Sequence, residues 1–273
     1  MSFYTSLNGL KNAQTQLGVV SHNIANAETT GFKKSRVDFA DIVAGSAFTN
    51  PKLTIGIGAS VEAISQNFSL GPLEQTGSAL DIAINGDGFF KTVSSPGGDA
   101  QFTRNGSFKV DGSGFIHDGS NNRLQVFPTN PTTGAVTSAT PISAQIPAVN
   151  TATPPADFAG VAVNENGNVV ASYADGSNMI IGKVALASFI SPTGLKQMGS
   201  SNWQQTGLSG APTYGQPGDG AFGGLLSGTL ERSNVDLSDE LVGLITAQRN
   251  FQANAKAIDT STQITQTILN LRT

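Results

Sequence analysis

The chain has 273 residues, 38% of them hydrophobic, which is enough to bury a core in one large domain or two smaller ones. Only 12% are charged, about half the roughly 25% usual in soluble domains, and the net charge of −4 provides no basic footprint for nucleic acid. The absence of cysteine excludes disulfides and thiolate metal sites, and no apolar run approaches the ~20 residues of a membrane-spanning helix.

Residues 1–30 predict a long N-terminal helix. A helix of about 25 residues would be roughly 37 Å long, and it would be marginal alone in water, so it needs a partner along its length. The first residues contain no basic stretch followed by an apolar one, so we expect no cleaved secretory signal peptide. The apolar side chains recur on one heptad seam, interrupted by Gln14 and Ser21, at Phe3, Leu7, Leu10, Leu17 and Ile24.

The stretch SHNIANAETTGFKK, residues 21–34, is where this helix is expected to end. Thr29 and Thr30 weaken helix formation, and Gly31 suits the left-handed backbone conformation that terminates many helices. Helix termination alone does not explain the amide side chains of Asn23 and Asn26. We place a connecting segment after the helix, over residues 31–70.

Residues 71–233 change from helical spacing to the alternation of polar and apolar residues that is typical of β-strands. The segment MIIGKVALASF, residues 179–189, is nearly continuous in apolar residues and fits a buried strand. The sequence therefore predicts a multi-hairpin all-β middle domain. Its strongest hairpin signals are Asn-Gly pairs, which occur at Asn85-Gly86, Asn105-Gly106 and Asn166-Gly167.

Within this middle domain, residues 128–155 differ from their surroundings. They are rich in Pro, Thr, Ser and Ala and have no clear period. We expect a long loop or linker on the surface of the β domain. The segment AVTSATPISAQI inside it could hold a short edge strand.

Residues 234–273 predict a second long helix. Asp236 is a plausible N-cap, and Asp239 and Glu240 in the first turn favour the helix dipole. A heptad seam of alternating four- and three-residue steps follows. It consists of Leu237, Leu241, Leu244, Gln248, Phe251, Ala255 and Ile258.

The two terminal helices allow two interpretations. They could be surface helices that cap a globular core, or they could pair with each other as a coiled coil, with polar seam residues such as Gln14 fixing the register. We favour pairing. The predicted fold class is α+β, with residues 1–30 and 234–273 forming a discontinuous helical inner domain and residues 71–233 forming the β-rich middle domain.

The chemistry-bearing residues do not form a recognisable site. His22 and His117 have no acidic or histidine neighbour at ligand spacing, so a solvated or hydrogen-bonded role is expected. The sequence NENGN, residues 164–168, lacks the downstream acidic ligand of a calcium loop and fits a hairpin turn better. No phosphate-binding loop or nucleophile elbow occurs. We expect no catalytic residue, no cofactor and no metal, and we do not expect an enzyme.

Several motifs resemble the bacterial flagellar axial proteins of the rod and hook. The segment NIANAETTGFKKSRVDF is similar to the family's segment after the first helix, and LDIAINGDGFF and FTRNGSFKVD are similar to its two β-domain motifs. The longest match is GTLERSNVDLSDELVGLITAQRNFQANAKAI, near the C-terminus. These matches cover about two thirds of the chain, and the similarity is greatest to hook proteins, in a short form that lacks most of the outer domain.

The choice between hook and distal rod depends on smaller features. The sequences MSFYTSLNGL, FADIVAGS and ILNLR look like those of hook proteins, and only AFTNPKLT, residues 47–54, stands where distal rod proteins carry a longer insertion. The overall length, in contrast, is closer to that of a rod protein. We expect a hook subunit, and we keep as alternatives a distal rod subunit or, more remotely, a β-rich adhesin or phage-tail type binding module.

The resemblance implies a helical homopolymer whose inner tube consists of paired terminal helices around an export channel. The implied partners are the distal rod, hook-filament junction and hook cap proteins and the flagellar type III export apparatus, without nucleic acid or membrane insertion. The implied location is the extracellular hook. We expect the inner tube to be held by Leu7, Leu10, Leu17, Ile24, Leu237, Leu241, Leu244, Phe251 and Ile258. A hinge and subunit contact is expected at Asn23, Asn26, Thr29, Gly31 and Phe32.

Overall fold

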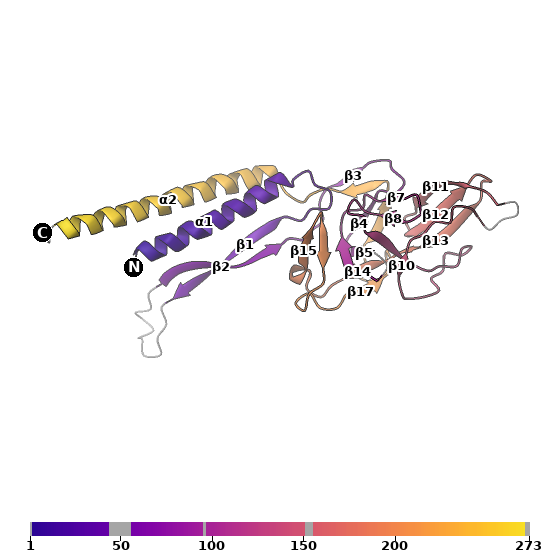
Figure 1. Cartoon of the computed structure of the whole chain (residues 1–273), viewed down its shortest axis with the longest axis horizontal. Helices are drawn as coiled ribbons and strands as arrows, with labels where there is room; N and C mark the ends of the chain where they lie inside the picture. The colour runs from indigo at the N-terminus through magenta and orange to yellow at the C-terminus, as the bar shows by residue number, and fades with distance from the viewer. Residues whose placement is uncertain (1, 44–55, 95–96, 151–154, 271–273) are drawn as a thin grey trace. The chain divides into compact units, whose positions relative to one another are not determined.

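The computed structural model describes residues 2–43, 56–94, 97–150 and 155–270 (Figure 1). The chain divides into two compact units. Unit 1 contains residues 1–27, 34–67 and 235–273, and unit 2 contains residues 28–33 and 68–234. The segment over residues 31–70, expected as a connection, is thus divided between the two units, and most of it belongs to unit 1. The sequence AFTNPKLT lies outside the described residues.

Unit 1 consists of helices α1 (Ser2–Ala25) and α2 (Leu237–Asn270) and a hairpin of strands β1 (Ser35–Val43) and β2 (Gly56–Gln66). Helix α1 packs against α2 along one side and against the hairpin along another (Figure 1). Polar side chains of α1 reach the hairpin backbone: Thr5 Oγ1 donates to the Ile57 carbonyl at 3.3 Å, and Asn12 Nδ2 donates to the Ala59 carbonyl at 2.7 Å.

The expected N-cap of the second helix is confirmed. Asp236 Oδ1 accepts hydrogen bonds from the backbone N–H groups of Ser238 at 2.8 Å and Asp239 at 3.2 Å. These are the groups at the start of a helix that have no partner inside it. Helix α2 therefore begins directly after Asp236, as the sequence predicts.

Unit 2 is the β-rich part of the chain, and most of its strands join one sheet with the order β11-β12-β13-β9-β5-β6-β16-β15 along its main path. Its main core is formed by Ile82, Phe90, Leu124, Val169 and Leu186 among others. A second cluster packs Phe89, Phe102, Phe189 and Trp203 in edge-to-face contacts.

The strands of unit 2 and its short 3-10 helix η2 have the following bounds: β3 Leu73–Gln75, β4 Ile82–Asn85, β5 Phe89–Val93, β6 Ala100–Thr103, β7 Lys109–Val110, β8 Ile116–His117, β9 Arg123–Phe127, β10 Ile142–Ser143, β11 Phe158–Val163, β12 Asn168–Tyr173, β13 Asn178–Val184, β14 Leu186–Ser188, η2 Pro192–Gly194, β15 Lys196–Gly199, β16 Asn202–Gln204, β17 Thr213–Gly215, β18 Gly224–Ser227 and β19 Thr229–Glu231.

One of the three Asn-Gly pairs forms the expected hairpin. Strands β11 and β12 pair antiparallel across the turn at Asn166-Gly167, where Gly167 has φ +79°. The other two expectations are wrong, because β4 pairs with β18 instead of β5, and β6 pairs with β5 and β16 instead of β7.

Close backbone packing explains these two glycines. A Cβ at Gly106 would lie 1.6 Å from the Ile82 carbonyl oxygen, and the Gly106 carbonyl accepts a hydrogen bond from the Ile82 N–H at 3.1 Å. A Cβ at Gly86 would lie 3.0 Å from the Gly223 Cα. Gly106 therefore requires glycine for the approach of a distant backbone segment. Gly86 requires it for such an approach and also because its φ is +126°. Neither glycine closes a two-residue hairpin turn.

The expected buried strand over residues 179–189 is formed as β13 followed by β14, with Val184, Ala185 and Leu186 fully buried. The Pro/Thr-rich segment 128–155 differs from a simple surface loop. It contributes β10, which pairs with β9 as a short edge strand, and it buries Ala144 and Ile146 in the core. Residues 151–154 of this segment lie outside the described residues.

Candidate assembly site on the terminal helices

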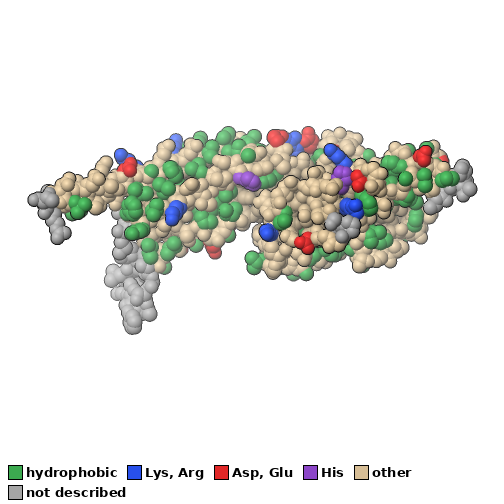
Figure 2. Space-filling model, viewed as in Figure 1, with side chains coloured by type: hydrophobic (Ala, Val, Ile, Leu, Met, Phe, Trp, Pro, Cys, Tyr) green, Lys and Arg blue, Asp and Glu red, His purple; other side chains and the backbone are tan. Residues whose placement is uncertain are grey.

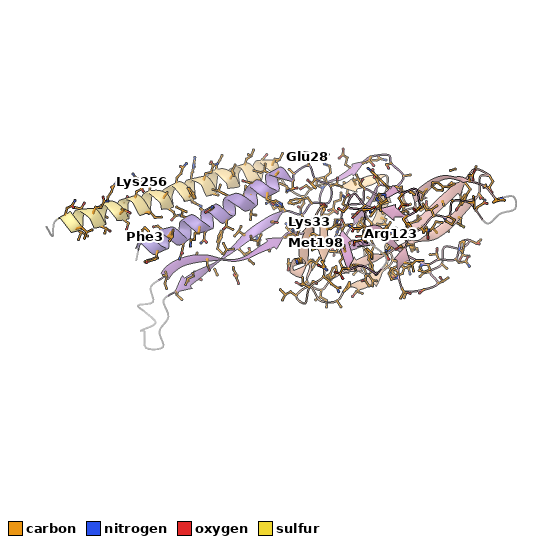
Figure 3. All side chains as sticks on the ribbon, viewed as in Figure 1. Phe3, Glu28, Lys33, Arg123, Met198 and Lys256 are labelled. Carbon is orange, nitrogen blue, oxygen red and sulfur yellow. The ribbon has the colours of Figure 1, made fainter. Side chains whose placement is uncertain are left out.

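Small residues bring α1 and α2 close together. A Cβ on Gly9 of α1 would lie 2.5 Å from Oδ1 of Asn254 in α2, and Gly243 of α2 faces Val20 of α1. Ala247 is fully buried on α2. The two helices run antiparallel. Asn23 near the end of α1 contacts Glu240 near the start of α2, and Gly9 in the first half of α1 contacts Asn254 further along α2. Phe3 and Lys256 are labelled on the two helices in Figure 3. Within one chain, the closest contacts between α1 and α2 therefore involve glycine and alanine and not the predicted leucines.

The residues predicted to hold the inner tube divide into two groups. Leu237 and Leu241 are exposed at 45% and 50%. The column of α2 that faces inward instead contains Glu240, Ala247 and Asn254, next to Leu244 and Phe251. The remaining members are half-buried: Leu7, Leu10, Leu17, Ile24, Leu244, Phe251 and Ile258.

An exposed apolar strip therefore lies on the first half of α2. It consists of Leu237, Leu241, Val242 and Ile245, which we call the α2 strip. Ile264, Ile268 and Leu269 are exposed further along the same helix. Figure 2 shows hydrophobic side chains gathered on the visible face of the helical part of unit 1. An amphipathic helix that leaves such residues in water is typical of an interaction surface.

Asn23 joins three elements of unit 1. Its side chain is 1% exposed and makes hydrogen bonds with both backbone groups of Ser35: Nδ2 donates to the carbonyl at 2.9 Å, and Oδ1 accepts from the N–H at 2.9 Å. Nδ2 also donates to Glu240 Oε2 at 3.1 Å, and Lys34 Nζ lies 3.7 Å from Glu240 Oε1. One amide thus connects α1, β1 and α2.

The other predicted hinge residues have different surroundings. Asn26 Nδ2 donates to the His22 carbonyl at 2.9 Å near the end of α1, and Thr29 is half-buried. Gly31 has the expected left-handed φ of +68°, but it lies six positions after α1 ends at Ala25. A Cβ there would lie 2.5 Å from the Asn105 backbone nitrogen. Phe32 is buried at 4% exposure. Gly31 therefore allows a close backbone approach within unit 2.

Next to Phe32, Lys33 enters a buried charged cluster in unit 2 (Lys33 is labelled in Figure 3). Lys33 Nζ lies 2.5 Å from Glu231 Oε1 and donates to the Ser69 carbonyl at 2.7 Å. Glu231 also accepts from the Gly71 N–H at 2.9 Å and pairs with Arg104 Nη1 at 3.5 Å. Burial lowers the pKa of Lys33 below its ordinary value, although the Glu231 carboxylate opposes this shift.

Sequence reasoning did not find the partners in these two polar contacts. Lys33 and Glu231 are in contact but are 198 positions apart in the sequence. Asn23 and Glu240 are likewise 217 positions apart. The sequence offered one indication of these contacts. All four residues belong to the motifs NIANAETTGFKKSRVDF and GTLERSNVDLSDELVGLITAQRNFQANAKAI, which flank the β-rich part. A charged residue next to Phe32 or Leu230 is a candidate for a buried partner, but the sequence does not say which charge it meets.

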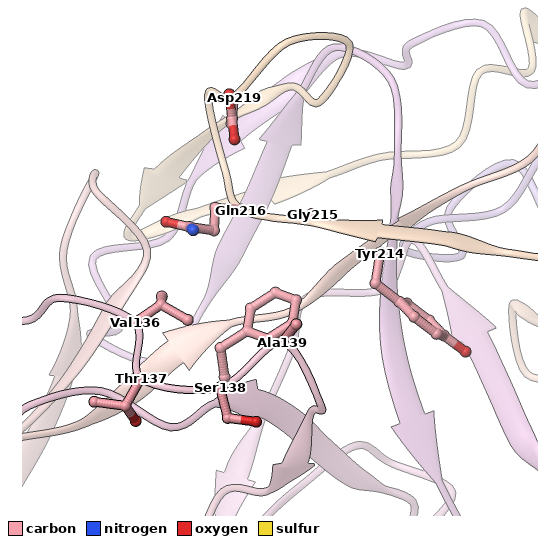
Figure 4. Close-up of a pocket in the computed structure, with 9 residues that line it drawn as sticks. Val136, Thr137, Ser138, Ala139, Tyr214, Gly215, Gln216 and Asp219 are labelled. Carbon is pink, nitrogen blue, oxygen red and sulfur yellow. The ribbon is translucent and has the colours of Figure 1, made fainter.

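The cavity of unit 2 in Figure 4 is lined by a single carboxylate, that of Asp219. The volume of this cavity is about 280 Å³, and aromatic and aliphatic side chains such as Phe127, Tyr214 and Val136 line it together with hydroxyl and amide groups. His117 Nδ1 lies 2.9 Å from the Asp118 carbonyl oxygen. Among the described residues, no three His, Cys, Asp or Glu side chains are grouped to hold a metal ion. Neither described helix is long and apolar enough to cross a membrane.

Comparisons with known proteins identify the family. Residues 3–33 match the family described as flagella basal body rod protein, residues 83–171 match the flagellar hook protein FlgE/F/G D1 domain, and residues 226–271 match the flagellar basal body rod FlgEFG protein C-terminal region. These ranges include both helices, Lys33 and Glu231.

Relatives extend the similarity over the whole chain. The flagellar basal-body rod protein FlgG of Bacillus subtilis is 37% identical over 99% of this chain and 98% of its own. FlgG of Borreliella burgdorferi is 30% identical over 99% and 98%. The flagellar hook protein FlgE of Escherichia coli is 28% identical over 100% of both chains, in an alignment of 410 positions. The chain therefore belongs to the flagellar rod and hook family, whose members are structural proteins of the flagellum and not enzymes.

Proposed function

We propose that this protein is the subunit of the flagellar hook, a helical tube that transmits torque from the motor to the filament while it bends. Members of the family polymerise and contact other axial proteins of the flagellum. The α2 strip is the observation that carries the proposal for this chain. Its apolar side chains lie on a helix whose opposite side already packs against α1, so a neighbouring subunit is the natural partner.

Two kinds of contact between neighbouring subunits suit the two demands on such a tube, which are torsional stiffness and bending. Burial of apolar side chains between neighbouring helices provides about 25 cal/mol for each Å² removed from water and stiffens the inner tube against torsion. The β-rich part has few charges and many amides and hydroxyls, and wet polar contacts between neighbouring subunits can exchange partners. We infer that the helices resist twisting and that contacts between β-rich parts permit bending.

The hook assignment is supported by the motifs MSFYTSLNGL and FADIVAGS and by the short sequence at residues 47–54. The alignment with FlgE of Escherichia coli needs 410 positions, whereas this chain has 273 residues, so the hook relative carries long additional segments. We propose that this subunit builds a hook without most of that outer region.

A distal rod subunit is the second candidate. The favouring observation is the length: the alignment with the FlgG rod protein of Bacillus subtilis takes 283 positions, close to the 273 residues of this chain, and covers 98% of that protein. A rod subunit would use the same terminal helices but would form a straight, rigid shaft. Its neighbours would be other rod proteins, whereas a hook subunit would meet the distal rod, the hook cap and the hook-filament junction proteins. Either would leave the cell through the flagellar type III export apparatus.

Electron microscopy of the purified, polymerised protein distinguishes these candidates. We expect tubes that curve and that adopt several curvatures in one field. Uniformly straight tubes would support the rod assignment. Only monomers or discrete small oligomers, under conditions that polymerise a known hook protein, would contradict both.

A further inference from the structure

Two large apolar side chains of unit 2 are almost fully exposed on one small surface. Ile190 is 92% exposed and Leu208 is 83% exposed. Their segments are adjacent, because the Ser191 N–H donates to the Ser209 carbonyl at 3.4 Å and Thr206 Oγ1 donates to the Gly194 carbonyl at 2.5 Å. We call this pair the Ile190–Leu208 knob.

The knob is held by a dense set of local contacts. Ser209 is fully buried, and its hydroxyl accepts from the Thr206 N–H at 3.0 Å and donates to the Thr206 carbonyl at 2.9 Å. A Cβ on Gly194 would lie 2.6 Å from the Leu208 carbonyl carbon, which shows how closely the two segments pack. A preorganised apolar projection loses little entropy on binding and is typical of an interface anchor.

The same unit carries an apolar groove. Val110, Ile146, Pro147 and Phe158 line a cavity of about 650 Å³. An adjoining cavity of about 440 Å³ shares Val110 and Phe158 and adds Leu80. We call these the β7–β11 groove. Concave, mostly apolar sites of 300–1,000 Å³ are of the size that encloses a small ligand, so two aliphatic side chains fit by volume.

Knob and groove belong to opposite ends of one sheet. The knob lies beside β15, one end of the main strand order, and the groove includes Phe158 at the start of β11, the other end. Figure 1 shows β15 and β11 well separated within unit 2. A chain therefore cannot place its own knob in its own groove, and the contact must be between copies. Because the two surfaces differ, such a contact is heterologous and can extend a polymer.

Charge also favours this pairing. Two carboxylates, those of Asp111 and Asp157, and one ammonium group, that of Lys109, line the groove, so the net charge of these side chains is negative. Lys196 is exposed and lies two residues after Gly194, the residue that packs against Leu208. We propose that the Ile190–Leu208 knob of one subunit binds the β7–β11 groove of the next copy of this chain. This inference rests on the proposed self-assembly and names the contact that links the β-rich parts.

Cysteine pairs test the contact directly, because the natural chain contains no cysteine. Leu208→Cys is combined in turn with Ser113→Cys, Gln145→Cys or Ala148→Cys, which all line the groove. After polymerisation and mild oxidation, at least one pair should give a ladder of covalent multimers in denaturing gels. Leu208→Cys alone and Leu208→Cys with Thr132→Cys, an exposed site outside the groove, should stop at dimers at most.

A charge substitution provides a second measurement. Leu208→Asp should raise the protein concentration needed for polymerisation on the order of tenfold, as loss of an interface anchor does. The matched control is Ile142→Asp, which changes a half-exposed isoleucine on β10 that belongs neither to the knob nor to the lining of the groove, and which should change that concentration little. Trp203 fluorescence verifies that unit 2 remains folded in both variants.

The outcomes separate this contact from the proposed function. Tubes without a ladder from any groove pair, together with normal polymerisation of Leu208→Asp, would overturn the knob contact and leave the hook assignment intact. Ladders without tubes would support the contact and overturn the assignment. The absence of both, with the natural sequence also failing to form tubes, would overturn both. If no ladder of this chain forms, and a groove cysteine instead cross-links to an added axial protein that carries an engineered cysteine, the occupant of the groove is that protein and not a second copy.

Discussion

Glu231 is the residue on which the buried charges of unit 2 depend. It is fully buried and is the anion that faces both Lys33 and Arg104, and it also accepts the Gly71 N–H. Removing the shared anion leaves two cations facing each other in a medium of low dielectric. Removing one cation leaves an ion pair. Substituting Glu231 should therefore destabilise unit 2 more than substituting Lys33, although each substitution deletes one charge.

We expect Glu231→Gln to lower the free energy of unfolding of unit 2 by about 3–5 kcal/mol, the usual cost of breaking a buried pair from one side. Lys33→Met should cost less, because Arg104 still pairs with Glu231 and a buried ammonium is no longer desolvated. Trp203, the single tryptophan, is buried in unit 2 and reports its urea unfolding by fluorescence. Equal losses for both variants, or a larger loss for Lys33→Met, would contradict this account.

Asn23 offers a second test at the scale of one residue. Asn23→Leu leaves the buried N–H and C=O groups of Ser35 without the hydrogen bonds that the Asn23 amide provides. We therefore expect the free energy of unfolding to fall by at least about 2 kcal/mol. Asn26, which bonds to the His22 carbonyl on its own helix turn, should tolerate leucine better. Thermal unfolding followed by circular dichroism at helical wavelengths compares the two, and electron microscopy shows whether each forms tubes. Normal flexible tubes and unchanged melting for both would remove Asn23 and Asn26 from the assembly mechanism.

At the scale of elements, the sequence predicts helices more reliably than it predicts which side of a helix is covered. The heptad steps locate α2, and Asp236 marks its start. The side of α2 that faces α1 is not the predicted leucine seam, because Gly9 lets Asn254 approach and Asn23 binds Glu240. A hydrophobic pattern gives no information about these polar and small residues. The leucines left outside are the ones available to a neighbouring chain.

This division gives different expectations for two aspartate substitutions in α2. Leu241→Asp changes an exposed side chain, so the monomer should keep its helix content while polymerisation is abolished. Phe251→Asp changes a half-buried side chain and should also reduce helix content. Sedimentation and circular dichroism measure both effects, with the exposed Gln252→Asp on the same helix as control. Tubes formed by full-length Leu241→Asp would refute the role of the α2 strip.

Strand pairing in unit 2 shows where prediction from sequence stops. The turn at Asn166-Gly167 is local, so its hairpin could be predicted. Gly106 instead serves a close contact with Ile82, and Gly86 combines a φ of +126° with a close contact to Gly223. Neither partner is a sequence neighbour across a turn. An Asn-Gly pair does not reveal whether its glycine is needed for backbone dihedrals or for close packing, and only the partner strand decides.

At the scale of the whole molecule, the division into units does not follow the chain order. Residues 28–33 belong to unit 2, although the residues on both sides of them belong to unit 1. Within unit 2 the Gly31 N–H donates to the Glu231 carbonyl at 2.8 Å, and Ser201 Oγ donates to the Thr30 carbonyl at 3.0 Å. Lys33 of the same segment pairs with Glu231. Residues 28–33 therefore bind to later parts of unit 2, at Ser201 and Glu231.

Two truncations that differ by only these six residues test its importance. A chain of residues 28–273 keeps the segment, and a chain of residues 34–273 loses it; both lack α1, so the effect of losing the helix cancels. We expect the shorter chain to unfold at a lower urea concentration by Trp203 fluorescence, because Glu231 then lacks Lys33 and the Gly31 N–H. The loss should be about 2–3 kcal/mol, mainly because the buried Phe32 side chain is removed from unit 2. Coinciding transitions would mean that residues 28–33 only rest on unit 2, and the stability of the β-rich part would then have to come from residues 68–234 alone.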